Sequence, residues 1–582
     1  MRRAALVAGL VLLACKSQPA SQPPATPSPA PAPAEIAREV AYTLGPVQEQ
    51  GQLTALAVEV RWHAPGSGVS KLVLPERWAD ARELWRHIEG FTVEGAQAVA
   101  EDGPAFRVIT AVPGAELVAR YRVRSAYASD PSSSDGQPFA PIVRPQWFHA
   151  FGESLFAVPD DDLDAPASFR WTGGADLPFA TDLEHFTGGR PGVVGDVLES
   201  VVIGGATLQV HTRPDEHLRV AILGEYGFTH AAFVDLAVKV VTSQRQFWGD
   251  HGQPFLITLA PQTKVVGSLT LGGTGRSDAF VLTISEDAPL ADLRHLLAHE
   301  YFHTWNPRQL GRELDGVPEG GDKWFAEGFT EFFTWRLLLR AGLYNLEEFV
   351  ADWNAALREY DTSPARSEPN SRIVADYWND RAVGRLPYRR GPLLAAIWEQ
   401  RLRSATNGAR DLDDVLLTMR DQVRAEPGAK LLPSQRFLAA YKQLGGPELA
   451  ADFETFVVQG APIELPVDVF GACVRVESTT RPVFERGWDP DATTKAGVIT
   501  GLQKGSPAYR AGLRDGMQIV ERTAGEVGNS TIAYVLKVRA GKRERTIKFM
   551  PAGKGQTVVR SLVLASVTPE QRAACTRALA GL

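Results

Sequence analysis

The chain has 582 residues, of which 44% are hydrophobic and 22% are charged, and its formal net charge is −7 at pH 7. This composition is typical of a soluble protein with packed cores, and the length predicts three or four domains. The charges are spread along the sequence without a basic stretch of the kind that binds nucleic acid, so we expect no nucleic-acid partner. Beyond the N-terminus, no apolar run is long enough to span a bilayer.

The first 15 residues are typical of a targeting segment. Arg2 and Arg3 precede an apolar run, Ala4–Ala14, as in a signal peptide. The run ends in Leu12-Leu13-Ala14-Cys15, which resembles the lipobox of bacterial lipoproteins. This resemblance implies that Cys15 becomes the lipidated first residue, and that the protein is anchored at the bacterial cell envelope, facing the periplasm or the surface. The alternative is an ordinary secretory signal with an incidental cysteine.

Two regions of different character follow this segment. Residues 16–35 are rich in Pro, Ser and Ala, and such a stretch behaves as an extended tether because it cannot bury a core. Residues 36–225 contain short runs that alternate apolar and polar residues between turn signals, for example Leu53–Ala64. This pattern predicts a β-sandwich-like N-terminal domain, and we see no catalytic constellation in it.

From residue 226 the apolar periods become longer. His230–Trp248 carries apolar residues at three- and four-residue spacing and predicts a helix, whereas Pro254–Leu259 and Ala279–Ile284 predict strands. A Gly-rich turn, Gly272–Gly275, is expected between these strands. It does not resemble a phosphate-binding loop, because no strand–loop–helix unit with a following Lys surrounds it.

A metal-binding motif follows the second strand. Four leucines at helical spacing precede it and place it on a helix: Leu290, Leu293, Leu296 and Leu297. His299 and His303 are four residues apart, so both imidazoles lie on one face of that helix and can share a metal ion. Glu300 is rotated away from them, in a position to act on a water molecule instead of the metal. The alternative is a helix with two unrelated histidines.

Zinc held by two histidines needs one more protein ligand and an open position. The stretch Trp324–Phe333, WFAEGFTEFF, predicts an amphipathic helix and offers Glu327. Together the two stretches predict a catalytic metal site.

HEYFHTWN followed by WFAEGFTEFF resembles the glycyl-aminopeptidase family of gluzincin zinc metallopeptidases with a C-terminal PDZ domain. The resemblance implies a multidomain α+β protein with a thermolysin-like, mainly α catalytic domain over residues 226–465. It also implies one zinc ion on His299, His303 and Glu327, with Glu300 as general base. Substrates would be peptides or proteins.

Further roles are implied around this site. Glu331, one turn after Glu327, matches an acid that accepts the ring N–H of a zinc-bound histidine in thermolysin-like sites; the alternative is a solvated charge. Tyr388 resembles a tyrosine that donates a hydrogen bond to the oxyanion in aminopeptidase gluzincins, with a packing tyrosine as the alternative. We expect His295 to be a pocket or surface histidine. Arg389 and Arg390 are expected to be exposed helix arginines, with contact to a substrate carboxylate as the alternative.

Substrate would be bound along the strand predicted at Ala279–Ile284, which in gluzincins forms the edge of the cleft and pairs with peptide backbone. Gly272, Gly273 and Asp278 precede that strand and are our candidate substrate-binding residues. Related families place a Glu in this Gly-rich segment to hold the substrate amine. Only Asp278 is acidic here, so we expect strict aminopeptidase preference to be weak or absent, and an endopeptidase is the rival.

Residues 466–567 form the last predicted domain. Gly497–Val520 resembles a PDZ domain of the bacterial protease type, with a peptide C-terminus as its possible ligand. Residues 568–582 predict a closing helix with a capping box at Thr568. Cys473 and Cys575 flank this domain and could form a disulfide in an oxidising compartment, or remain free.

We therefore expect a zinc-dependent peptidase tethered to the cell envelope. The alternative is a tethered PDZ lipoprotein that binds or scaffolds peptides and has a structural or vestigial metal site. An intact motif with Glu300 favours the enzyme, because a structural site has no use for that residue.

Overall fold

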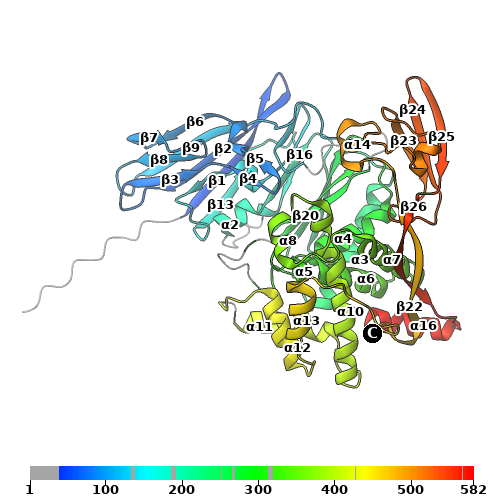
Figure 1. Ribbon diagram of the computed structural model, residues 1–582. Coiled ribbons are helices and arrows are strands. Elements are labelled where there is room, and N and C mark those ends of the chain that lie inside the picture. The colour runs from blue at the N-terminus through cyan, green and yellow to red at the C-terminus, as the bar shows by residue number, and fades with distance from the viewer. Residues whose placement is uncertain are drawn as a thin grey trace, which may run out of the picture. The chain divides into compact units, whose positions relative to one another are not determined.

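The computed structural model describes residues 39–132, 138–184, 192–250, 252–264, 269–311, 318, 320–426, 428–566 and 568–582 (Figure 1). The predicted targeting segment with Cys15 and the tether lie outside these residues. Within the described chain, no helix has both the length and the apolar character needed to cross a membrane. The fold is multidomain α+β, with several sheets and a large helical region.

The first region is built from three main sheets. The six-stranded sheet has the order β15 (Gly192–Val193), β13 (Pro166–Trp171), β1 (Val40–Glu49), β2 (Gln52–His63), β9 (Glu116–Val123) and β6 (Ile88–Glu94). One four-stranded sheet contains β12 (Val158–Pro159), β3 (Val69–Val73), β8 (Phe106–Thr110) and β7 (Ala98–Glu101). The other contains β10 (Ile142–Arg144), β11 (Trp147–Phe151), β16 (Val201–Gly205) and β14 (Phe179–Thr181). Buried side chains alternate along β2, including Val58, Val60 and Trp62, as the sequence pattern predicts.

A small hairpin and two short helices complete this region. The hairpin pairs β4 (Arg77–Trp78) with β5 (Ala81–Arg82), and the helices are α1 (Gly152–Leu155) and α2 (Val194–Leu198). Apolar residues of the six-stranded sheet and of both four-stranded sheets share one core.

The second region begins with a five-stranded sheet. Its order is β17 (Gln209–Arg213), β18 (Leu218–Ile222), β19 (Phe255–Gln262), β21 (Ala279–Ser285) and β20 (Leu271–Gly275). The pairs β18–β19 and β19–β21 are parallel, whereas β20 runs antiparallel to β21. Two of these strands, β17 and β18, precede residue 226, where the sequence placed the start of this region.

The edge of this sheet differs from the sequence prediction. The strand expected there, β21, is covered on both sides by β19 and β20 and is buried along its whole length. The edge strand is the Gly-rich segment itself, β20, which we expected to be a turn. Pairing with β21 supplies backbone hydrogen bonds that Gly-rich residues cannot gain from local structure alone.

Helices cover the sheet and form the rest of the second region. They are α3 (His230–Trp248), α4 (Leu293–Phe302), α5 (Lys323–Ala326), α6 (Gly328–Arg340), α7 (Leu346–Thr362), α8 (Asn370–Asp376), α9 (Arg381–Arg385), α10 (Pro387–Ala405), α11 (Leu412–Ala425), α12 (Pro433–Gln443) and α13 (Ala450–Asp452). The bounds of α3 confirm the predicted helix, which begins after the N-cap Thr229 and ends at Gly249 in a left-handed conformation.

Helix α6 lies at the centre of this region. Every residue from Gly328 to Leu339 is buried. The helix predicted around Glu327 is therefore present, but the prediction that it is amphipathic is wrong. The reason is that α3, α4, α7, α10 and α16 (Pro569–Ala580) all pack against it (Figure 1). A helix surrounded in this way must satisfy its polar side chains internally.

The third region has a small core of its own. A long two-stranded ribbon pairs β22 (Val474–Phe484) with β26 (Ala552–Leu564), and a three-stranded sheet contains β23 (Gln518–Ala524), β24 (Tyr534–Ala540) and β25 (Arg543–Phe549). Helices α14 (Pro490–Ala496) and α15 (Pro507–Arg510) accompany the sheet. Its core includes Trp488, Ile499 and Leu536. The chain ends in α16, with the predicted capping box between Thr568 and Gln571.

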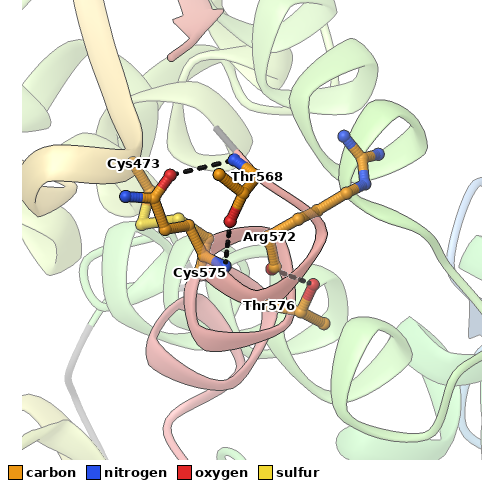
Figure 2. The surroundings of a disulfide bond; sticks show 6 residues. Cys473, Thr568, Arg572, Cys575 and Thr576 are labelled. Carbon is orange, nitrogen blue, oxygen red and sulfur yellow. Dashed lines mark hydrogen bonds between the residues drawn. A yellow bond between two sulfur atoms is a disulfide. The ribbon is translucent and has the colours of Figure 1, made fainter. Parts of the chain in front are cut away.

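A disulfide joins the start of the ribbon to the last helix. Cys473 and Cys575 have their Cα atoms 5.6 Å apart and are separated by 102 positions in the sequence. Figure 2 shows the bridge beside Thr568, the N-cap residue of α16, and beside Arg572 and Thr576 within that helix. The bridge encloses the whole third region, since all its strands lie between the two cysteines.

Loss of this bridge is expected to destabilise the protein. Cys575→Ser should lower the free energy of unfolding by about 2–4 kcal/mol, because a long closed loop restricts the unfolded chain. Chemical denaturation measures the effect, with the exposed neighbour Ala574→Ser as the control. Titration of thiols in unfolded, unreduced protein should find none at these two positions. Two reactive thiols there would contradict the bridge.

Candidate metal centre

The metal-binding motif lies at the end of α4. His299 is in the last turn of this helix and His303 follows its last residue in right-handed helical conformation, so the predicted spacing is kept. The two Nε2 atoms are 3.1 Å apart. Both rings therefore point to the same place.

Glu327 lies at the junction of α5 and α6. Its Oε2 atom is 3.4 Å from Nε2 of His299 and 3.3 Å from Nε2 of His303. The neighbouring Gly328 explains the position: a Cβ atom on it would lie 2.3 Å from the Cα of Gly391 in α10. The absence of a side chain lets α6 and α10 touch here, which brings Glu327 close to the start of α10.

The loop after α4 fixes the orientation of His303. Nδ1 of His303 is 2.7 Å from the carbonyl oxygen of Asn306, to which it donates its proton. The Asn306 side chain in turn donates to Ala326 O at 3.2 Å and to Thr330 Oγ1 at 3.1 Å. In the neutral ring this bond places the proton on Nδ1, so that Nε2 is available as a metal ligand.

These three donor groups fit a zinc ion. One ligand atom from each of His299, His303 and Glu327 lies within 4.8 Å of the other two. Ligands at 2.0–2.1 Å around a tetrahedral ion are separated by about 3.3 Å, which agrees with the three distances above. Within the described chain, the buried Glu327 Oε2 has no hydrogen-bond donor. A carboxylate in that position needs a cation or a proton to be stable.

A cavity of about 750 Å³ opens onto these residues. Glu300, His303, Glu327 and Tyr388 line it together. Burial raises the pKa of the Glu300 carboxyl, which makes this group a better base than an exposed glutamate. The candidate base Glu300 and the candidate metal ligands His303 and Glu327 therefore face the same cavity.

Tyr388 is the second residue of α10. Its hydroxyl is 3.1 Å from the hydroxyl of Tyr377, and its ring stacks on that of His299 with centroids 5.9 Å apart. Burial raises its pKa well above the usual value, and the charge of Glu327 adds to this effect. The phenol is therefore protonated and can donate a hydrogen bond. Tyr377 was not identified from the sequence, where nothing distinguishes it from a packing residue.

Glu331 is buried beside the histidines, not solvated. Its Oε2 atom is 2.6 Å from Nε2 of His295 but 3.9 Å from Nδ1 of His299, so its hydrogen bond goes to the histidine one turn before the motif. Arg389 Nη1 is 3.2 Å from the other oxygen. Although burial alone would raise the pKa of Glu331, His295 and then Arg389 hold it well below its usual range.

Two expectations about this neighbourhood are wrong. The Arg389 side chain is only 12% exposed because it pairs with Glu331 and Glu359. Arg390 is fully buried and donates to the backbone of Glu368. Both arginines lie in the first turns of α10, where Arg389 pairs with carboxylates from α6 and α7 and Arg390 donates to backbone carbonyls before α8. His295, which was expected in a pocket or on the surface, has a side chain that is 32% exposed and bonds to Glu331.

If Glu331, 3.9 Å from Nδ1 of His299, orients that ring when zinc is bound, Glu331→Ala should weaken zinc affinity by about 10- to 100-fold. Competition with a chromophoric chelator measures this. Glu359→Ala is the matched control, since it removes the other carboxylate on Arg389 and touches no histidine. His295→Ala should also weaken zinc affinity, by a smaller factor, if Glu331 acts on the site through the His295 ring. Unchanged affinity in Glu331→Ala would exclude the orienting role.

The three candidate substrate-binding residues are not grouped as expected. Gly273 lines the cavity with Thr274 and Gly275, because β20 runs beside α4. Gly272 is buried in the same strand. Asp278 lies in the turn between β20 and β21, where its carbonyl accepts from Leu256, and it is not among the described residues that line the cavity.

Comparison with known proteins agrees with this geometry. Residues 292–380 match the family model of the M61 glycyl aminopeptidases. The matched segment contains both histidines, Glu300, Glu327 and Glu331, whereas Tyr388 lies beyond it. A comparison with curated proteins gave no match.

Solved structures extend the likeness over most of the chain. An aminopeptidase N family protein from Idiomarina loihiensis covers 92% of this chain and 100% of its own, with a TM-score of 0.65 and 15% identity. The two chains therefore share a fold. An M1 zinc metallopeptidase from Deinococcus radiodurans covers 74% of this chain and 95% of its own, with a TM-score of 0.46 and 15% identity.

Proposed function

We propose that this protein is a zinc-dependent peptidase that hydrolyses peptide bonds with Glu300 as general base. One observation carries the proposal: the donor atoms of His299, His303 and Glu327 converge at the cavity that Glu300 and Tyr388 also line. The family match over residues 292–380 supports it.

Each residue then has a defined task. His299, His303 and Glu327 would hold one zinc ion, which when bound lowers the pKa of a water molecule and polarises a carbonyl group. Glu300 accepts a proton from the attacking water and later delivers it to the leaving amine. Tyr388 donates its hydroxyl proton as a hydrogen bond to the oxygen that becomes negative in the transition state.

Strict aminopeptidase specificity is not part of the proposal. An aminopeptidase needs an acid that faces the substrate amine, and Asp278 does not line the cavity. Apart from Glu300 and Glu327, the only acid among the described lining residues is Asp322. One of its oxygens accepts the backbone N–H of Ser434 at 3.1 Å. An unpaired ammonium group near zinc is unfavourable, so N-blocked peptides should be cut about as well as free ones.

The test combines metal analysis with cleavage mapping. The purified protein should contain one zinc per chain, lose activity with a chelator and regain it with zinc. Mass spectrometry of a library of free and N-acetylated peptides gives the cleavage sites. Stoichiometric zinc without any turnover would instead favour the peptide-binding alternative. A hundredfold preference for free amines would contradict the relaxed specificity and make Asp322→Asn the next variant.

We also propose a tether and a peptide-binding module. A lipid on Cys15 would hold the protein at the bacterial cell envelope, and Cys15→Ser should release it from the membrane fraction; retention after a salt wash would refute this.

The resemblance of Gly497–Val520 to a PDZ domain supports C-terminal peptide binding by the third region, whose small core includes Ile499, Leu513 and Met517. Binding of C-terminal free-acid and amide peptides to the full chain tests that role.

A further inference from the structure

The β4–β5 hairpin of the first region forms one wall of the catalytic cavity. Its Trp78 ring packs on the guanidinium of Arg276, which lies 4.4 Å from the ring centroid. Arg276 follows β20 directly and donates to Glu153 at 2.6 Å. These contacts hold the hairpin beside the edge strand that lines the cavity.

Two arginines face each other across this hairpin. Arg77 pairs with Arg82 in the β4–β5 register. Directly opposite residues of an antiparallel pair lie on the same face, and like charges in that position are destabilising. Both side chains are exposed and line the cavity. No hydrogen bond or ion pair joins either guanidinium group to another residue of the described chain.

Most arginines of the first region form ion pairs. Between residues 39 and 132, five arginines form ion pairs with glutamates: Arg61, Arg86, Arg107, Arg120 and Arg124. In this described segment only Arg77, Arg82 and Arg122 lack such a partner. Arg122 is exposed on β9 and does not line the cavity. The two unpaired arginines at the cavity therefore stand out from their surroundings.

In the described chain, the remaining charged residues of the cavity are two cations and three acids, and the acids are Glu300, Glu327 and Asp322. Lys323 and Arg308 also line it. Lys323 lies 3.4 Å from Glu327 and Arg308 contacts the Glu199 carboxylate, so both are partly compensated. Glu76, Asp80 and Glu83, the acids nearest to the hairpin arginines in sequence, do not line the cavity, and Glu83 pairs with Arg86. A substrate that extends beyond the catalytic residues thus meets two free guanidinium groups.

We propose that Arg77 and Arg82 bind a carboxylate of the peptide substrate and make the enzyme selective for peptides that carry one near the scissile bond. The inference rests on the proposed peptidase function and names its substrate class. Guanidinium groups suit a carboxylate because they offer paired N–H donors in a plane. The carboxylate could belong to an acidic side chain or to the peptide C-terminus, and the experiment separates these sources.

The test uses three N-acetylated peptides of otherwise identical sequence with the zinc-loaded full chain. The first has an internal Glu and an amidated C-terminus, the second has Gln in place of that Glu, and the third has Gln with a free C-terminal carboxylate. We expect kcat/KM for one or both acidic peptides to exceed that of the neutral peptide by about tenfold, the effect of one or two ion pairs. In the R77Q/R82Q variant this ratio should fall to within about twofold.

Two controls separate specificity from general damage. Arg122→Gln removes another exposed and unpaired arginine that lies away from the cavity, so this variant should keep the kcat/KM ratio of the unmodified protein. The preference should also weaken from about 20 mM to about 500 mM salt, because screening weakens exposed ion pairs. Equal cleavage of all three peptides, or an unchanged ratio in the double variant, would overturn the inference and leave the peptidase function intact.

Binding provides a readout that does not depend on turnover. In the Glu300→Gln background, calorimetry should show tighter binding of the acidic peptides than of the neutral one, and R77Q/R82Q should remove the difference. If the unmodified enzyme cleaved none of the peptides, the peptidase proposal would fail, whereas these binding data would still decide whether the hairpin recognises carboxylates.

Discussion

Glu300→Gln is expected to reduce kcat/KM by about 10²–10⁴-fold while the protein keeps one zinc per chain. The amide has the size of the carboxylate but cannot accept the proton of the attacking water. Glu300 lines the cavity and contributes no atom to the cluster of candidate metal ligands, so its replacement should leave metal binding intact. Atomic absorption and steady-state kinetics on the same sample measure both quantities.

Two variants make this result specific. Glu327→Ala should lose the metal together with the activity, because it removes a ligand of the cluster. Glu286→Gln changes an exposed carboxylate just after β21 and should alter neither property. Loss of zinc from Glu300→Gln would show that this residue holds the metal, and the assignment of the base would have to be abandoned.

Asp361→Ala is expected to lower the free energy of unfolding by about 3–5 kcal/mol, because it leaves the Arg560 charge buried without a partner. The two side chains are 4% and 5% exposed, with Arg560 Nη2 2.5 Å from Asp361 Oδ1. Asp361 also accepts the backbone N–H of Arg560 at 2.7 Å. This pair joins α7 of the second region to β26 of the two-stranded ribbon, so its loss should weaken the attachment of the third region to the second.

The same arginine offers its own control. Glu464 lies 3.8 Å from Arg560 Nη1 but is 85% exposed, so Glu464→Ala should change stability by less than about 1 kcal/mol. Replacement of both buried partners, Asp361→Leu with Arg560→Met, should restore most of the lost stability because no charge remains buried. Equal effects of Asp361→Ala and Glu464→Ala in urea denaturation would contradict the role of the buried pair.

The metal centre could be predicted from the sequence because its geometry is mostly local. Helical periodicity fixes the relation of His299 to His303, and α4 keeps it to its last turn. Glu327 comes from another helix, but the short distance along the chain and the composition of WFAEGFTEFF pointed to it. The exact bounds of α3 were predictable for the same reason, since its cap and apolar period are contained within the segment.

Long-range packing decided the rest. The sequence could not show that Gly272 and Gly273 form an edge strand instead of a turn, because that depends on pairing with β21. Nor could it show that Glu331 bonds His295, which follows from the contact between α4 and α6. The pairing of Arg389 with Glu331 and the burial of Arg390 likewise depend on the packing of α10. The position of Arg77 and Arg82 at the cavity is the extreme case. More than 200 residues separate them from His299, and long-range contacts such as the packing of Trp78 on Arg276 bring the hairpin to the site. A local sequence pattern determines which side chains share one face of a helix or strand. Which distant helices and strands come into contact depends on how the whole core packs.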